Sequence, residues 1–116
     1  NTPLQALVLL NDPQFVEAAR YLAVRAMRRG GRQPGEWLEF AFRLATSRRA
    51  TADERRILQA EYADRVREFR GNEALAGAYL TRAARDMAPD LDPAQWAACA
   101  AVCSLILNLD ESISSS

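Results

Sequence analysis

Cys99 and Cys103 are the residues of this 116-residue chain whose type most directly suggests chemistry. They lie four positions apart in a helical pattern, and side chains one turn apart on a helix are poorly placed for a disulfide. Two thiols without a third ligand are too few for a metal site, and a thiol in apolar surroundings is inert because its pKa is raised. We therefore expect both cysteines to be buried, reduced and metal-free.

Histidine is absent from the chain. This excludes a Ser-His or Cys-His dyad within the segment, zinc sites of the usual Cys/His kind, and haem attachment through Cys-x-x-Cys-His. The paired acids Asp90 and Asp92 have the positions of caps and turn residues rather than of a general acid and base. We assign no catalytic, metal-binding or cofactor-binding residue and expect no cofactor.

Arginines occupy positions 48–49 and 55–56, around one expected loop. Such a cluster could bind phosphate or nucleic acid. However, Asp53 and Glu54 lie in the same stretch, and the whole chain balances 15 basic against 15 acidic residues. Because few phosphates could be neutralised, counterion release would contribute little to binding. A solvated loop is the favoured interpretation, an arginine-mediated nucleic-acid binder the least favoured, and we expect no nucleic-acid partner.

Polar side chains follow the two most apolar segments of the chain. Asn11 and Asp12 follow the first, and Asn108, Asp110 and Glu111 follow the last. Buried amides and carboxylates need hydrogen-bond partners, so capping and inter-helix hydrogen bonds are favoured over a ligand or metal site. If the two segments pack in parallel, Asn108 and Asp110 approach Asn11 and Asp12. If they pack antiparallel, Asn108 and Asp110 approach the first residues of the chain. We call these five residues the candidate polar cluster.

Helix-start and helix-stop signals indicate the elements that position these residues. Thr-Pro or Asp-Pro pairs at 2–3, 12–13 and 92–93 place a capping side chain before a proline at the first helical position. Thr51 and Glu54 form a capping box, Asn72 is a weaker start, and Gly30-Gly31 and Gly71 are expected stops. The signals predict helices over 3–10, 13–29, 35–46, 52–70, 73–86 and 93–107.

Apolar periodicity gives the expected core. Residues 96–107 are almost all apolar or small, which is typical of a buried helix, and residues 4–10 are its expected neighbour. The helices over 35–46 and 52–70 each offer an apolar stripe: Trp37, Leu38, Phe40, Ala41 and Leu44 in one, and Ile57, Leu58, Tyr62, Val66 and Phe69 in the other. No segment alternates with period two. We predict an all-α fold, a compact bundle of about six helices that forms a single domain over residues 1–116.

Three stretches of the sequence are familiar as motifs. They are residues 1–20 (NTPLQALVLLNDPQFVEAAR), residues 41–48 with the capping box at 51–54, and residues 105–111 (LILNLDE). Together they resemble the C-terminal part of the PSD-type domain of unknown function, found in exported planctomycete proteins that often also carry a cytochrome-c-like domain. The resemblance implies an exported or cell-envelope location. It supplies no activity, cofactor or catalytic residue.

Two functions remain open at this stage. No apolar stretch reaches the ~20 residues of a transmembrane helix, and the chain opens at Asn1 without a methionine, which predicts a fragment of a larger protein. The first function is a non-catalytic helical structural or interaction module at the C-terminus of a larger exported protein, packed against its other domains or a protein partner. The second is one wall of an enzymatic or ligand-binding site completed by upstream domains. An exposed apolar patch would favour the module, and a polar cleft near the candidate polar cluster would favour the wall.

Overall fold

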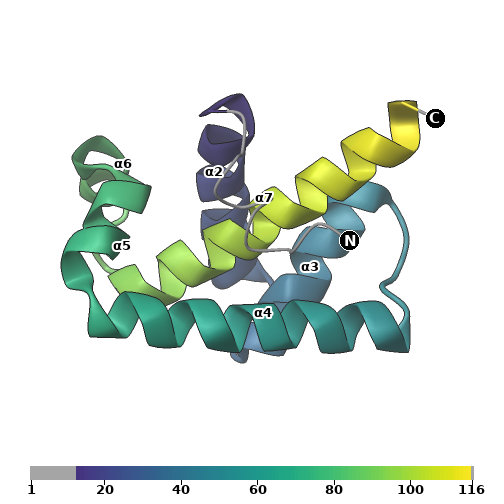
Figure 1. Cartoon of the computed structure of the whole chain (residues 1–116), viewed down its shortest axis with the longest axis horizontal. Coiled ribbons are helices and arrows are strands. Elements are labelled where there is room, and N and C mark those ends of the chain that lie inside the picture. Colours follow the sequence, from purple (N-terminus) through teal and green to yellow (C-terminus); the bar gives the residue numbers. More distant parts are fainter. Residues whose placement is uncertain (1–12, 116) are drawn as a thin grey trace.

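Six α-helices and no strand make up the part of the chain that the structure describes. The structure, a computed structural model, describes the backbone of residues 13–115 and the side chains of residues 16–109. The helices, labelled as in Figure 1, are α2 (Pro13–Arg29), α3 (Pro34–Thr46), α4 (Ala52–Gly71), α5 (Glu73–Leu80), α6 (Arg82–Met87) and α7 (Pro93–Ser115). The predicted all-α fold is confirmed. The helix predicted over 3–10 lies outside the described residues.

Side-chain caps begin the helices where the sequence indicates. Thr51 Oγ1 accepts a hydrogen bond from the Glu54 amide at 3.1 Å, and Glu54 Oε1 accepts one from the Thr51 amide at 2.9 Å. Asn72 Oδ1 and Asp92 Oδ2 accept from the amides three residues on, at 3.1 and 3.0 Å. These bonds satisfy amides that have no partner within the helix, so the predicted starts of α4, α5 and α7 are confirmed.

Two helix boundaries differ from the prediction. The helix expected over 73–86 is two helices, because Thr81 adopts φ 66° and ψ 155° and caps α6 by accepting a hydrogen bond from the Ala84 amide at 3.3 Å. The last helix continues to Ser115 instead of ending at 107. No glycine or proline follows residue 107, so nothing stops α7, and Asn108 lies inside the helix.

The predicted stop at Gly71 is confirmed in position. Gly71 is the last residue of α4, but it does not adopt a left-handed backbone. Among the described residues the positive φ angles are at Gly31, Ser47 and Thr81. Ser47 ends α3 by donating its amide to the Arg43 carbonyl at 2.8 Å.

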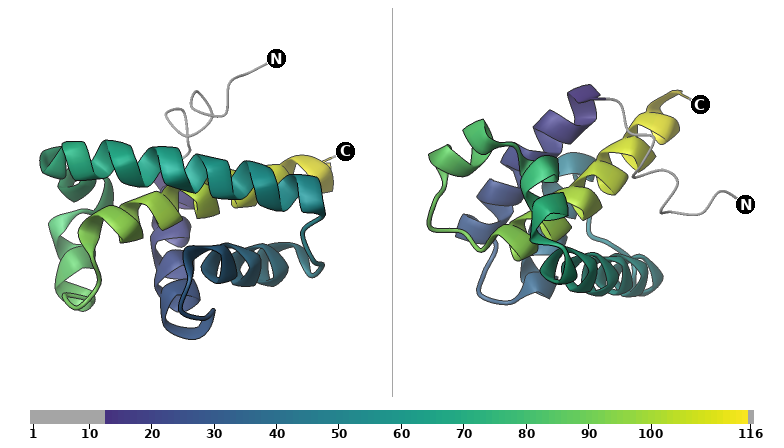
Figure 2. Two further views of the ribbon diagram at one scale, coloured as in Figure 1. Left: turned by 90° about the horizontal axis from the view of Figure 1, so that it is seen from below. Right: turned by 60° about the vertical axis from the view of Figure 1, so that its left-hand side comes forward.

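α7 is the central helix of the bundle, and α2, α3, α4 and α5 all pack against it (Figures 1 and 2). Its first half is buried on every side, as predicted. The residues that are wholly inaccessible there include Ala97, Ala98, Cys99, Ala100, Ala101, Val102 and Cys103. Small side chains let neighbouring helices approach closely. Burial of this helix therefore organises the fold.

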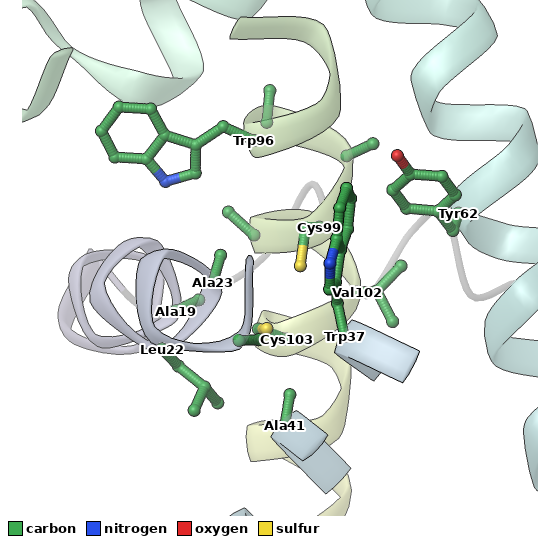
Figure 3. Packing of buried hydrophobic residues seen from close by; sticks show 14 of the residues in the cluster. Ala19, Leu22, Ala23, Trp37, Ala41, Tyr62, Trp96, Cys99, Val102 and Cys103 are labelled. Carbon is green, nitrogen blue, oxygen red and sulfur yellow. The ribbon is translucent and has the colours of Figure 1, made fainter. Parts of the chain in front are cut away.

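Two tryptophans fix the helices around α7 (Figure 3). Trp96 lies on α7 and donates its Nε1–H to the Arg20 carbonyl of α2 at 3.2 Å. Trp37 donates its Nε1–H to the Gly31 carbonyl at 2.9 Å and makes an edge-to-face contact with Tyr62, with ring centroids 6.3 Å apart. Each buried indole therefore has its hydrogen-bond partner, as buried tryptophans usually do.

Leu44 and Ile57 depart from the expected core. They are 45% and 50% exposed, whereas Phe42, which is not part of the predicted stripe, is 2% exposed. At about 100° per residue, Leu44 and Ile57 each lie roughly a quarter-turn from the centre of the buried face of their helix. The predicted apolar stripes are therefore on the correct helices, but each extends too far round one side of its helix.

Candidate functional site

The two cysteines lie in the core beside α2 and α3 (Figure 3). Both thiols are free and wholly buried, so the predicted burial and the absence of a disulfide between them are confirmed. A hydrogen bond with the Cys99 thiol, together with burial, raises the pKa of Cys103 well above its ordinary value. Such a thiol is a poor nucleophile. Within the described residues, no three histidine, cysteine or acidic side chains gather in the way a metal site requires.

The arginines of the α3–α4 loop are largely paired with carboxylates. Arg48 forms a two-pronged ion pair with Glu54, with N···O distances of 2.8 and 2.9 Å, and its guanidinium lies 4.8 Å from the centre of the Phe42 ring. Hydrogen bonds from Arg48 and from the Thr51 amide lower the pKa of Glu54 to about 2. Two further pairs lie beside the loop, Arg56 with Asp53 in the first turns of α4, and Arg55 of α4 with Glu39 of α3. This pattern agrees with a solvated loop.

Of the candidate polar cluster, Asn108 is the member whose side chain the structure describes, and it is half-buried within α7. The expectation that it follows the end of a helix is wrong, because α7 continues past it. Asp110 and Glu111 belong to the same helix, but their side chains lie outside the described part, as do Asn11 and Asp12. Whether the cluster forms a network stays a prediction.

Two charged side chains are buried between α4 and the rest of the bundle. Glu61 and Arg65 are 7% and 8% exposed, and Arg65 Nε lies 3.3 Å from Glu61 Oε2. Arg65 Nη1 also lies 3.0 Å from Glu68 at the rim. Burial raises the pKa of the neighbouring Tyr62 to about 12, so its hydroxyl stays protonated. The two residues form a buried pair of opposite charges one turn apart on α4, outside the three clefts described below.

Two clefts that the sequence does not predict lie beside the turn between α6 and α7. The first, which we call the α6 cleft, has a volume of about 340 Å³ and lies between α6 and the first turn of α7. Its lining includes Arg82, Arg85, Asp86, Ala88, Leu91 and Trp96. The second, the α4–α5 cleft, has a volume of about 620 Å³, and its charged residues are Arg70, Glu73, Arg85 and Asp92. Arg85 lines both clefts.

The α6 cleft depends on a break between two helices at Thr81, which the sequence does not signal. If residues 73–86 formed a single helix, Arg82 and Arg85 would lie on an ordinary solvated face. The backbone of Thr81 turns α6 away from α5 instead, so that both arginines line a cleft with the start of α7. A positive φ at threonine is rare, and no propensity rule would have predicted it.

A third cleft, about 380 Å³ in volume, lies between α3 and α4. Its lining includes Phe40, Glu39 and Arg55. Its charged residues are Glu36, Glu39, Arg43 and Arg55, of which Glu39 and Arg55 form an ion pair at 3.9 Å. Asn108 lines none of these three clefts, so none adjoins the described member of the candidate polar cluster.

Comparison with known proteins relates the chain to one family. The model of the PSD1 family, described as a protein of unknown function (DUF1553), matches residues 1–62, more than half of the 116 residues. No curated protein matches the chain. No solved structure matches it either. The matched stretch includes α2, α3 and the first half of α4, whereas the α6 cleft lies beyond it. The chain belongs to the PSD1 (DUF1553) family of proteins of unknown function.

Proposed function

We propose that the chain is a non-catalytic helical module that packs against other domains of a larger protein or against a protein partner. The observation that supports this concerns three of the six large apolar side chains that are exposed in the described part of the chain. They are Leu44, Ile57 and Leu109, which are 45%, 50% and 42% exposed. They come from the end of α3, the first turns of α4 and the second half of α7, and these segments lie at one end of the bundle (Figures 1 and 2). We call the three residues the apolar end.

The apolar end fits a contact surface better than a reactive site. Single exposed leucines are common on any protein and need no partner, but three from separate helices at one end offer apolar area that a second surface can bury. The paired charges around it, Arg48 with Glu54 and Arg56 with Asp53, resemble the polar rim of an interface. The family resemblance implies that the larger protein is exported.

Labelling of introduced cysteines tests this proposal. Leu44→Cys, Ile57→Cys and Leu109→Cys each place a thiol at the apolar end, and the natural Cys99 and Cys103 give little background because they are buried. We expect each introduced thiol to react with a maleimide at least about tenfold more slowly in the full-length parent protein than in this chain alone, because the parent would cover it.

Arg67→Cys is the matched control, because the Arg67 side chain is 74% exposed on α4. It should react at the same rate in both proteins. Equal rates at all three positions of the apolar end would contradict the module. The alternative function, a wall of a site completed by upstream domains, predicts protection at Leu109, the neighbour of Asn108, but not at Leu44 or Ile57.

None of the helices in the described part of the chain combines the length and apolar content needed to cross a bilayer.

We also propose that nucleic acid is not a partner. Of the four arginines at 48–49 and 55–56, three have carboxylate partners. A micromolar complex with duplex or single-stranded DNA at about 150 mM salt would contradict this.

A further inference from the structure

We propose that the α6 cleft binds a small monovalent carboxylate that carries an apolar group, with Arg82 and Arg85 holding the carboxylate. This inference is independent of the module proposed above, because the α6 cleft involves none of the three residues of the apolar end.

The first argument is the pairing of charges around the turn between α6 and α7. Arg28 lies 2.9 Å from Asp90, and Arg70 lies 3.5 Å from Asp92. Within the described part of the chain, no hydrogen bond or ion pair involves the side chain of Arg82 or of Arg85. Two neighbouring cations in one cleft therefore lack the partners that the cations beside them have.

The second argument is the position of these two guanidinium groups. Arg82 and Arg85 are three residues apart on α6, a spacing that puts two side chains on the same side of a helix. Arg85 also lies against Gly77 of α5, where an added Cβ would come within 3.4 Å of its Nη1 atom. A guanidinium presents a planar fork of N–H donors that matches a carboxylate.

The third argument is the apolar part of the same cleft. Ala88, Leu91 and Trp96 line it together with two prolines. Trp96 and Ala88 are each 2% exposed, so most of the apolar surface open to a ligand belongs to Leu91 and the two prolines. Trp96 is held by its hydrogen bond to the Arg20 carbonyl, so the apolar part of the cleft exists before any ligand binds. Small-molecule sites combine apolar surface with convergent polar groups, and about 340 Å³ is at the small end of their range.

The net charge of the cleft selects the kind of anion. Arg82 and Arg85 contribute two positive charges and Asp86 one negative charge, which leaves a net charge of +1. A monovalent carboxylate neutralises this charge. A phosphate dianion would overcompensate it and would bring no apolar group to the wall, so we infer a carboxylate rather than a phosphate.

NMR titration of the ¹⁵N-labelled chain with 3-phenylpropanoate tests the proposal, because the two tryptophans provide a signal and a reference. The indole N–H of Trp96 should shift saturably with a Kd of about 1 mM, while that of Trp37, which packs on Tyr62 away from this cleft, should not move. The neutral 3-phenylpropanamide should bind at least about tenfold more weakly, and inorganic phosphate should give no saturable shift of Trp96.

Charge-removing variants complete the test. Arg82→Gln and Arg85→Gln should each weaken 3-phenylpropanoate binding about tenfold. Arg49→Gln removes the same charge from the loop at the other end of the molecule and should leave the Kd unchanged. An unaltered Trp37 signal shows that each variant is folded. Any of three results would overturn the proposal: no saturable Trp96 shift up to about 50 mM, equal affinity for the amide or for phosphate, or equal weakening by Arg49→Gln.

Discussion

Two regions of the molecule differ in how much apolar side chain they bury. One is the half built on α7, and the other is the end formed by α5 and α6. From Trp96 to Ile106 every residue of α7 is buried, and four other helices pack on it. The buried residues of α5 and α6 are few: Ala76, Leu80 and Ala84. Free energy of folding therefore comes mainly from the α7 half.

The α5–α6 end carries the features that a well-packed core excludes. Thr81 has a backbone conformation that is close to glycine-only, Arg82 and Arg85 have no charged partner in the described part of the chain, and both clefts beside the α6–α7 turn open there. Regions with little buried apolar area open locally at low free-energy cost. The α7 half therefore supplies most of the stability, and the α5–α6 end contains the two clefts.

The largest expected effect is the contrast between two identical substitutions. Leu105→Ala, at a side chain that is 1% exposed on α7, should lower the free energy of unfolding by about 3–5 kcal/mol because it leaves a cavity. Leu75→Ala on α5, where the side chain is 40% exposed, should cost less than about 1 kcal/mol. Urea denaturation of both variants measures the difference, and similar losses would show that the two regions contribute equally.

The buried ion pair of α4 gives the next largest effect. Arg65→Met keeps much of the side-chain volume but leaves the Glu61 carboxylate buried without its partner. The free energy of unfolding should fall by about 3 kcal/mol. Adding Glu61→Gln should restore part of the loss, because no buried charge then remains. If the double variant is as unstable as the sum of the two single variants, the pair is not coupled.

The sequence predicted the α7 half well for a physical reason. Its signals are local: a capping side chain before Pro93, an uninterrupted apolar run, and the capping box at Thr51 and Glu54. Each depends on residues within a turn or two of one another, so the helices and the burial of Cys99 and Cys103 follow without knowledge of the tertiary structure.

The α5–α6 end could not be predicted in the same way. The break at Thr81 requires a backbone conformation that threonine rarely adopts, and tertiary packing rather than local preference decides it. The clefts depend on where α6 comes to lie relative to α7, and the pairing of Arg28 with Asp90 joins residues 62 positions apart. No local pattern in the sequence therefore indicates that Arg82 and Arg85 line a cleft.

Thr81 provides a test of strain at this end. Thr81→Gly should raise the free energy of unfolding by about 1 kcal/mol, because relief of the strained backbone outweighs the lost cap and the greater entropy of glycine in the unfolded chain. Thr51→Gly is the control, since Thr51 is also a helix cap but has φ −70° and ψ 168°. It should lower stability by up to about 1 kcal/mol. Thermal melts of the two variants that shift in the same direction would contradict strain at Thr81.

The smallest expected effect concerns the paired charges of the α3–α4 loop. Hydrogen bonds from Arg48 and from the Thr51 amide lower the pKa of Glu54 from its ordinary 4.5 to about 2 in the folded protein. A depressed pKa stabilises the folded state above the unfolded-state pKa, and this contribution is lost as pH falls from about 4.5 towards 2. Since the Glu54 side chain is 34% exposed, solvent screening limits the contribution to under about 1 kcal/mol. Urea unfolding at pH 7 and at pH 3 should therefore show Glu54→Gln less stable than the parent chain at pH 7 and closer to it at pH 3.

Glu73→Gln on α5, where the carboxylate has no ion pair in the described part of the chain, should show no such convergence. If both variants converge equally, the pH dependence belongs to the overall charge of the molecule rather than to the Arg48–Glu54 pair.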